Sequence, residues 1–366
     1  MTHLSRHATA ALALTLMATF LGGCDEAPAP TLTGPGAAMD TYLTNLPGGH
    51  SFQGAVLVAR GSEVLFSKGY GLADQRTGSP NSPDTLYRIG WVTMQFTALA
   101  VLKLQELGKL KVTDRVCRYV TPCPASWKAV TVAHLLVHSS GIPDYYSQIP
   151  AFRSLRMTTL SPLELIGIFR DEPLQSAPGS RWQYSLSGHA LLGHIIERLT
   201  GLSYADFLRQ RILDPLGLSA TGYDVNEPTA EAHAVGYTGG SSPAVADDVS
   251  VLYAGGALYS SVNDLARWNR FLLTGTPAIV EPETLTEMFT PRVPLDAALS
   301  GWQSAYGGFI LGPPANATRS HGGSMAGYAA TSLVKPRDQM SVIVLSNNQG
   351  LSTEAIADRL ATIASP

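Results

Sequence analysis

A serine followed by a lysine three residues later is a catalytic pattern, because on a helix both side chains lie on one face. The lysine takes the proton of the serine, which then attacks a carbonyl group. This spacing occurs once in the sequence, at Ser332 and Lys335. The two residues lie in a β-rich run, where side chains three apart point to opposite faces of a sheet. We therefore predict no catalytic role for this pair.

Three other patterns also fail to predict a site. Residues 322–326 read Gly-Gly-Ser-Met-Ala, but a nucleophile elbow needs a helix after the turn, and the residues that follow are strand-like. His134 and His138 have the spacing of metal ligands on a helix, yet no Glu lies between them and no third ligand is evident. His189 and His194, five apart, do not share a helix face. We expect no metal and no cofactor, and we interpret His134 and His138 as scaffold.

A longer motif carries a resemblance to a known family. Residues 86–98 read Leu-Tyr-Arg-Ile-Gly-Trp-Val-Thr-Met-Gln-Phe-Thr-Ala. They resemble the nucleophile motif of class C-type β-lactamases, serine esterases and D-alanyl-D-alanine carboxypeptidases, which reads Arg-Ile-Gly-Ser-x-x-Lys. Further stretches resemble the same family in order and spacing from about residue 50 to the end: 66–74, 134–144, 184–193, 259–268, 321–323 and 342–348. The resemblance implies an α/β (α+β) fold of the β-lactamase/transpeptidase type, with an antiparallel sheet flanked by helices and an inserted helical lobe.

The catalytic side chains that the resemblance implies are replaced in this sequence. Trp91 stands at the serine position, Met94 at the lysine position, and Leu186 at the asparagine position of the Tyr-x-Asn element. An indole and a thioether cannot form an acyl-enzyme, and an indole also fills the space of a substrate carbonyl. The nearest hydroxyl, Thr93, faces away from residue 91 and has no lysine one turn later. We therefore expect no intact catalytic residue.

Some positions of the implied cleft keep their residue types. Tyr184 stands at the family's tyrosine, and His321, Gly322 and Gly323 stand where its third motif lines the cleft. Oxyanion donors are backbone atoms, so the N–H groups of residue 91 and Ser324 can persist whatever the side chains. These residues are candidates for substrate binding. For Tyr184 and His321, a purely structural role in packing is an equally good interpretation.

Three hypotheses follow. In the first, the protein is a pseudo-hydrolase: a cell-envelope lipoprotein with a binding or scaffolding role, whose partner is a peptidoglycan fragment, a peptide or another small acyl ligand. In the second, it is a hydrolase or acyl-transfer enzyme of non-standard mechanism that uses Tyr184 and His321 as an acid–base pair. In the third, the cleft is closed and partners bind an outer surface. The sequence favours the first over the second and does not separate the first from the third.

The elements that must position these residues follow from periodicity. Residues 53–60 and 63–70 are β-rich runs around a Gly-Ser turn, and β character returns at 306–311, 328–335 and 339–346. Helical spacing predicts helices at 92–107, 131–138, 161–171, 187–199, 203–213, 262–273, 281–289 and 353–363. We expect strands from both ends of the chain in one sheet, terminal helices on one face, and a helical lobe at about 91–300.

The first residues predict export and a membrane anchor. Arg6 precedes the apolar stretch 8–21, which is too short for a comfortable span and typical of a signal peptide at 1–23. Cys24 follows Leu-Gly-Gly and resembles the lipidated cysteine of bacterial lipoproteins, and Asp25 after it resembles an inner-membrane retention signal. The stretch 24–37 is a predicted tether, and 38–366 the predicted domain. We expect a lipid-anchored protein on the periplasmic or extracytoplasmic side.

Composition and cysteine count complete the prediction. The chain has 366 residues, of which 45% are hydrophobic and 14% charged, enough to bury a large core. A net charge of −3 without basic runs gives no electrostatic basis for nucleic-acid binding. Cys117 and Cys123 are the two cysteines besides Cys24. In an exported protein they favour one loop-closing disulfide over a pair of buried thiols.

Overall fold

The computed structural model describes residues 33–47, 51–226, 233–239, 241–296, 299–313 and 317–365. The predicted signal peptide, Cys24 and Asp25 lie outside these ranges. Within them, no helix combines the length and apolar character needed to cross a bilayer. The first helix, α1, spans Gly34–Thr44, so residues 34–37 belong to its first turns. The domain therefore begins a few residues before the start we expected from composition.

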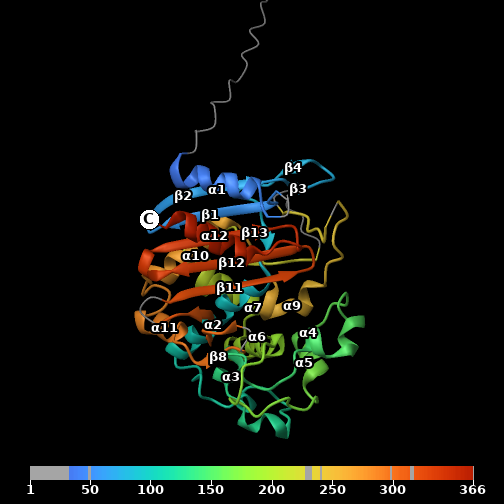
Figure 1. Cartoon of the computed structure of the whole chain (residues 1–366). Helices are drawn as coiled ribbons and strands as arrows, with labels where there is room; N and C mark the ends of the chain where they lie inside the picture. The colour runs from blue at the N-terminus through green and yellow to red at the C-terminus, as the bar shows by residue number, and fades with distance from the viewer. Residues whose placement is uncertain are drawn as a thin grey trace, which may run out of the picture.

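Eight antiparallel strands form the central sheet, in the order β2-β1-β13-β12-β11-β10-β9-β8. Their bounds are β1 Gly54–Arg60, β2 Glu63–Tyr70, β8 Val293–Pro294, β9 Trp302–Ala305, β10 Gly308–Leu311, β11 Thr318–Met325, β12 Tyr328–Lys335 and β13 Met340–Ser346. The N-terminal strand β1 pairs directly with the C-terminal strand β13. Figure 1 shows the blue and red strands side by side. The predicted sheet built from both ends of the chain is confirmed.

Side-chain alternation along β1 separates two hydrophobic cores. Val56 and Val58 pack with α1 and the last helix, α12 (Thr353–Ala364), in a core on one face of the sheet. Ala55 and Leu57 belong to the larger core shared with the helical lobe. Because both faces are covered, β1 reads as a continuous apolar run rather than an alternating one. The terminal helices lie on one face, as expected.

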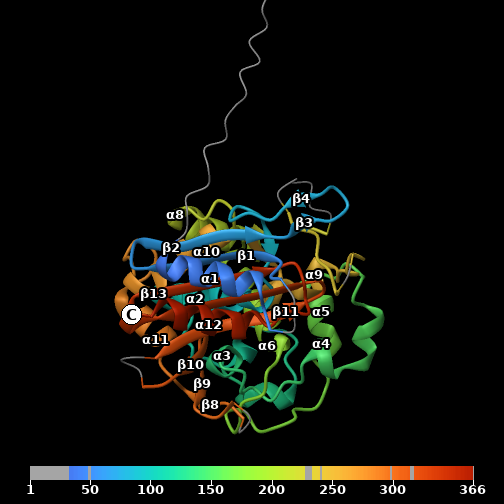
Figure 2. The same cartoon turned by 45° about the horizontal axis from the view of Figure 1, so that its top comes forward.

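The inserted helices lie between β5 and β8 in sequence. They are α2 Thr93–Glu106, α3 Val132–Leu136, α4 Tyr145–Gln148, α5 Pro162–Phe169, α6 Leu186–Thr200, α7 Tyr204–Leu208, α8 Asp214–Leu216, α9 Val249–Gly256, α10 Val262–Thr274 and α11 Pro282–Met288. Those drawn in green, α4 and α5, lie at one edge of the molecule (Figures 1 and 2), whereas α10 packs on β13 and β1 of the central sheet. Short strands form two small sheets outside the central one: β3 Leu72–Asp74 with β4 Ser79–Pro80, and β5 Tyr87–Arg88 with β6 Gly222–Tyr223 and β7 Leu258–Ser260.

Several predicted elements differ in length from the observed ones. The helix expected at 203–213 is divided into α7, a π-helical turn at Arg209–Leu213, and α8. The helix expected at 131–138 ends at Leu136, and His138 follows it with a positive φ of 56°. Periodicity alone did not predict helix α9 or strand β11. The predicted disulfide is present between Cys117 and Cys123.

Candidate functional site

Trp91 lies in a single 3-10 turn, Gly90–Val92, just before α2. Gly90 has a φ of +49°, a conformation that favours glycine, and Ile89 N donates to Leu258 O at 3.0 Å. This anchored turn directs the indole between α9 and β11. A Cβ placed on Gly256 would lie 2.7 Å from Cζ3 of Trp91, and one on Gly323 would lie 2.6 Å from its Cγ. The indole therefore occupies the gap between the helical lobe and β11.

Met94 follows one turn later on α2 and is buried, with 1% of its surface exposed. Its Sδ accepts a hydrogen bond from the Tyr184 hydroxyl at 3.7 Å. Thr93 is also fully buried, and its Oγ1 accepts from the backbone N–H of Leu258 at 3.2 Å. Its hydroxyl is thus engaged on the side of the helix away from the cleft. The first turn of α2 presents no nucleophile and no base to β11.

The segment before α6 places Tyr184 and Leu186 on the lobe side of the cleft. Leu186 N donates to Oδ1 of Asp144 at 2.9 Å, which holds the start of the helix, and its side chain packs against Gly255. The Tyr184 ring stacks on His138 with centroids 4.7 Å apart. Burial raises the pKa of the Tyr184 hydroxyl well above its ordinary value, so the group stays protonated. It acts here as a neutral donor to sulfur.

Strand β11 carries His321, Gly322, Gly323 and Ser324 past Trp91. His321 is buried, its ring lies 5.3 Å from that of Phe309, and its Nδ1 has no hydrogen-bond partner within the described residues. Burial lowers the pKa of His321 to about 3, so it is neutral at pH 7. Ser324 is exposed and pairs with Ala329 of β12. The predicted binding residues therefore lie along one strand, with the indole against its middle.

Sequence reasoning missed a cluster of three buried histidines under Met94. His138 and His189 have ring centroids 5.0 Å apart, and together with His321 and Met94 they surround a space too small for a water molecule. Burial lowers the pKa of His138 to about 4 and that of His189 well below its ordinary value. Both ring nitrogens of His189 lack a hydrogen-bond partner in the described part of the chain. All three histidines belong to the family-like stretches, and grouping those stretches in space would have found them.

The arrangement of the three histidines does not match a metal site. Among the described residues, no group of three or more His, Cys, Asp or Glu side chains is placed to hold a metal ion. The predicted scaffold role of His134 has a local basis, since its Nδ1 accepts from Thr131 N and its own N–H donates to Thr131 Oγ1. His134 thus caps α3, while His138 lies beyond the helix end. The two are not on one helix, which corrects the spacing argument.

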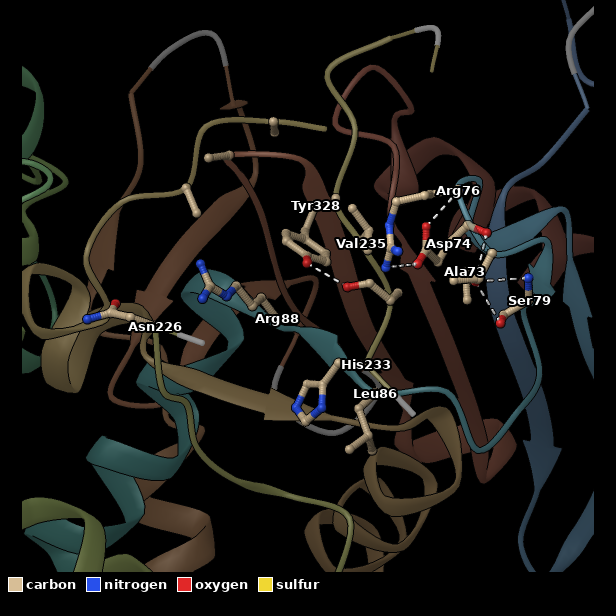
Figure 3. Close-up of a pocket in the computed structure, with 16 residues that line it drawn as sticks. Ala73, Asp74, Arg76, Ser79, Leu86, Arg88, Asn226, His233, Val235 and Tyr328 are labelled. Atoms are coloured by element: carbon tan, nitrogen blue, oxygen red, sulfur yellow. Dashed lines mark hydrogen bonds and ion pairs between the residues drawn. The ribbon is translucent and has the colours of Figure 1, made fainter. Parts of the chain in front are cut away.

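Two cavities share Ala326, in the turn between β11 and β12, as a lining residue. The larger, of about 690 Å³, lies over β3, β5 and the segment 233–236 (Figure 3). In its wall Arg88 forms a buried ion pair with Asp224 at 2.5 Å, and Tyr328 donates to Ala234 O. The other, of about 580 Å³, is lined by Tyr146, Ser324 and their neighbours. The Tyr146 ring meets Trp91 edge to face at 5.7 Å, so this second cavity lies next to the part of the cleft that the indole fills.

The comparisons agree with this geometry. The family profile described as Beta-lactamase matches residues 39–364. A putative penicillin-binding protein, PbpX of Bacillus subtilis (strain 168), is 29% identical over 302 residues, 81% of this chain and 71% of that protein. Protein flp of Staphylococcus aureus (strain MRSA252) is 27% identical over 321 residues, 84% of this chain but 62% of flp.

Solved structures give the same result. The octameric penicillin-binding protein homologue from Pyrococcus abyssi superposes with a TM-score of 0.74 and 30% identity, covering 85% of this chain and 72% of that one. The D-amino acid amidase from Ochrobactrum anthropi SV3 superposes with a TM-score of 0.76 over 90% of this chain and 98% of its own, and at 22% identity it shows the fold alone. The chain belongs to the beta-lactamase family, with an indole in the gap between its helical lobe and β11.

Proposed function

We propose that this protein is a catalytically inactive member of its family, an envelope lipoprotein that binds an acylated peptide such as a peptidoglycan fragment without cleaving it. The observation that carries the proposal is the position of Trp91, whose indole packs against Gly323 and Gly256. Acyl transfer through a serine requires a nucleophile, a base to activate it and room for the carbonyl. Trp91 is not a nucleophile and Met94 is not a base, and the indole fills the space that the carbonyl would need.

The binding role is supported by what remains open beside the indole. Strand β10 pairs with β11 only at residues 318–320, so beyond Ser320 this edge of β11 has no strand partner within the described residues. Unpaired strand edges bind extended peptides through main-chain hydrogen bonds. The cavity of about 580 Å³ lies at this edge and is lined by Tyr146, Arg156 and Ser324. It offers the ring of Tyr146 and the guanidinium of Arg156, and this guanidinium forms an ion pair with Asp247 at 2.7 Å.

The alternative function, an enzyme that uses Tyr184 and His321, gains less support. The Tyr184 hydroxyl donates to Met94 Sδ, and Nδ1 of His321 has no partner among the described residues. The pKa of His321 is lowered to about 3 and the pKa of Tyr184 is raised well above 10. An efficient acid–base pair needs pKa values near the working pH. The pKa of His321 lies well below neutral pH and the pKa of Tyr184 lies well above it, so neither group exchanges a proton readily near pH 7.

The test combines turnover with binding on the mature protein. Nitrocefin and p-nitrophenyl acetate should be hydrolysed no faster than in buffer, while calorimetry with an N-acetylated D-alanyl-D-alanine peptide should detect saturable binding. Tyr146→Ala should weaken this binding, and Tyr42→Ala on α1, far from the cleft, should leave it unchanged. Turnover that disappears when one cleft residue is changed would overturn the proposed inactivity. Absence of any peptide binding would favour a closed cleft and an outer binding surface.

The anchor is proposed from the first residues alone and has its own test. Cys24→Ala should move the protein from the membrane fraction to the soluble fraction of cells and abolish incorporation of labelled fatty acid. Retention in the membrane fraction with unchanged labelling would contradict lipidation at Cys24. Asp25→Ser should then shift the protein between membranes if the retention signal operates in this bacterium.

A further inference from the structure

A cavity among the inserted helices is separate from the cleft beside Trp91. Its volume is about 220 Å³, and within the described residues it shares no lining residue with the cavities next to Trp91, β11 or α12. Helices α7 and α9 both pack on α6 at this place (Figure 1). These helices and strand β6 line the cavity with Glu197, Tyr204, Tyr223 and Tyr253. We call this space the tyrosine cavity.

Three tyrosine rings form adjacent walls of the tyrosine cavity. The ring of Tyr204 meets that of Tyr223 edge to face, with centroids 6.1 Å apart, and its centroid lies 5.5 Å from that of Tyr253. Tyr204 is buried, and its hydroxyl lies 2.6 Å from Oγ1 of Thr97, a buried residue of α2. Tyr204 therefore directs its hydroxyl into the core and presents its ring to the cavity.

The backbone of Tyr253 is held in a conformation that side chains rarely adopt. Its φ of 39° and ψ of −135° interrupt α9, and its ring lies against Gly193 of α6, where a Cβ would be 2.6 Å from Cε1. Such conformations persist only where the surrounding structure imposes them, and they cluster at ligand sites. Tyr253 is 5% exposed, and its hydroxyl has no hydrogen-bond partner among the described residues. A buried hydroxyl without a partner costs stability, so this one is available to a polar group that enters the cavity.

The tyrosine cavity carries a negative charge that the protein does not neutralise. Oε1 of Glu197 accepts from Tyr204 N at 2.9 Å, and the carboxylate forms no ion pair among the described residues. No lysine or arginine lines the cavity within the described part of the chain, and the neighbouring Arg198 is exposed. Burial lowers the pKa of His194, one turn earlier on α6, so that imidazole supplies no positive charge at pH 7. Burial and then the charge of Glu197 raise the pKa of Tyr253, so its hydroxyl stays protonated beside the carboxylate.

A neutral hydroxyl, a carboxylate and aromatic rings around a small space define one class of ligand. A primary ammonium group can donate to the hydroxyl oxygen and to the carboxylate, and aromatic rings attract the same cation. We propose that the tyrosine cavity binds a primary ammonium group on a slender alkyl stem. The ammonium N–H groups donate to Oη of Tyr253 and to the carboxylate of Glu197, and the stem packs against the rings of Tyr204 and Tyr223. This site does not depend on whether the cleft beside Trp91 binds a peptide.

Probes of one shape and different charge test the proposal. NMR titration of the mature protein at pH 7 compares n-butylamine, 1-butanol and butyrate, which are a cation, a neutral molecule and an anion. The amine should bind about tenfold or more tightly than the alcohol, because the carboxylate and the rings favour the cation, and butyrate should not bind. Tetramethylammonium has the charge but no N–H group, and it should bind more weakly than n-butylamine. Equal binding of the amine and the alcohol, or no binding of the amine, would overturn the proposal.

A further probe separates two sources of the same chemistry. A primary ammonium group on an alkyl stem belongs either to a small free amine or to the side chain of a lysine in another polypeptide. Nα-acetyl-lysine amide should bind at least as tightly as n-butylamine if the source is a lysine side chain. Binding of n-butylamine without binding of the lysine derivative supports a small free amine.

Substitutions then locate the site. Glu197→Gln removes the charge but keeps an acceptor for Tyr204 N, and it should reduce n-butylamine binding to the level of 1-butanol. Tyr253→Phe removes only the hydroxyl and should weaken amine binding about fivefold. Glu283→Gln, which removes an exposed carboxylate from α11, is the matched control and should leave binding unchanged.

Amine binding that survives Glu197→Gln at full strength would contradict the site. Thermal unfolding of each variant reports whether the fold is intact. If Glu197→Gln does not fold, Tyr253→Phe decides, and unchanged amine binding in that variant would contradict the site in the same way.

Discussion

The two faces of β11 show how differently one strand can be used. On the face toward the lobe, Gly323 lies against the Trp91 indole, and three buried neutral histidines fill the space beneath Met94. On the face toward α12, Gly322 lies under Glu354 at the edge of an open, aromatic and acidic cavity. The first face is packed with an indole and neutral imidazoles, whereas the second carries an exposed carboxylate.

The comparison teaches that this scaffold forms with apolar side chains at positions 91, 94 and 186. Strand pairing, the turn before α2 and the start of α6 depend on backbone hydrogen bonds and apolar packing, and these do not need a serine or a lysine. The indole and the thioether fill the space at these positions through apolar contacts. The consequence is that acid and added methyl groups should destabilise the protein more through the filled face than through the open face.

The largest expected effect is acid destabilisation of the lobe-side face. Burial holds the pKa values of His138, His189 and His321 below their value near 6.5 in the unfolded chain, so unfolded molecules bind more protons as the pH falls. Stability is fully present above about pH 7 and is lost as the pH falls toward the folded values. Between pH 7 and 5.5 each histidine should cost about 1 kcal/mol of unfolding free energy, roughly 3 kcal/mol in total. Urea unfolding across this range measures it.

One variant separates the histidines from other acid-sensitive groups. His189→Leu removes a side chain whose two nitrogens lack partners among the described residues, so stability at pH 7 should not fall by the full amount of a core substitution. The slope of unfolding free energy against pH should decrease by about one proton near pH 6. An unchanged slope would contradict burial of this imidazole in its neutral form.

Next in size is the cost of a methyl group on the filled face. Gly323→Ala places a Cβ within 2.6 Å of Cγ of Trp91, and overpacking of this kind should cost about 2 kcal/mol of unfolding free energy. In a Trp91→Ser background the same change should cost much less, because the indole is gone. Denaturant unfolding of the four proteins of this cycle measures the coupling. Additive costs would show that the indole does not lie against Gly323.

The same methyl group on the open face should cost less. Gly322→Ala meets Oε1 of Glu354, the end of an exposed and flexible side chain, with Thr331 Oγ1 at 2.9 Å as the harder contact. We expect a loss of about 1 kcal/mol, independent of Trp91→Ser. Comparing the two alanine variants under identical conditions tests the contrast between the faces directly. A larger loss at Gly322 than at Gly323 would reverse the assignment of the filled face.

The smallest effect is expected at the retained tyrosine. Tyr184→Phe removes only a hydrogen bond to a thioether, a weak acceptor, and leaves the ring stacked on His138. Unfolding free energy should change by about 0.5 kcal/mol or less. Any activity found by broad substrate screening should persist in this variant. Loss of such an activity would revive the acid–base hypothesis for Tyr184 and His321.

Local sequence patterns predicted most of the fold but only part of the site. Strong periodicity identified β1, β2, β12, β13, α2 and α6, and the pairing of both ends in one sheet followed from that pattern. Strand β11 was missed because its Arg-Ser-His-Gly-Gly run has neither alternation nor β-branched residues. The identities of Trp91, Met94 and Leu186 were readable in sequence, whereas the direction of the indole depends on the backbone at Gly90.

Long-range contacts account for the rest. His138, His189 and His321 come from three distant segments, so no spacing rule groups them. The cavity beside α12 likewise combines Trp182, inside the inserted lobe, with Glu354, which follows the lobe in sequence. Helical spacing predicted that His134 and His138 lie on one helix. The observed helix ends at Leu136, so His138 lies outside it.

Intact-mass spectrometry after exposure to an activated acyl compound is the most direct test of the central claim. The mature protein, incubated with excess penicillin G and separately with p-nitrophenyl acetate, is expected to keep its unmodified mass at times when an active family member is fully acylated. A covalent adduct that peptide mapping places on a residue of the cleft around Trp91 would contradict the claim.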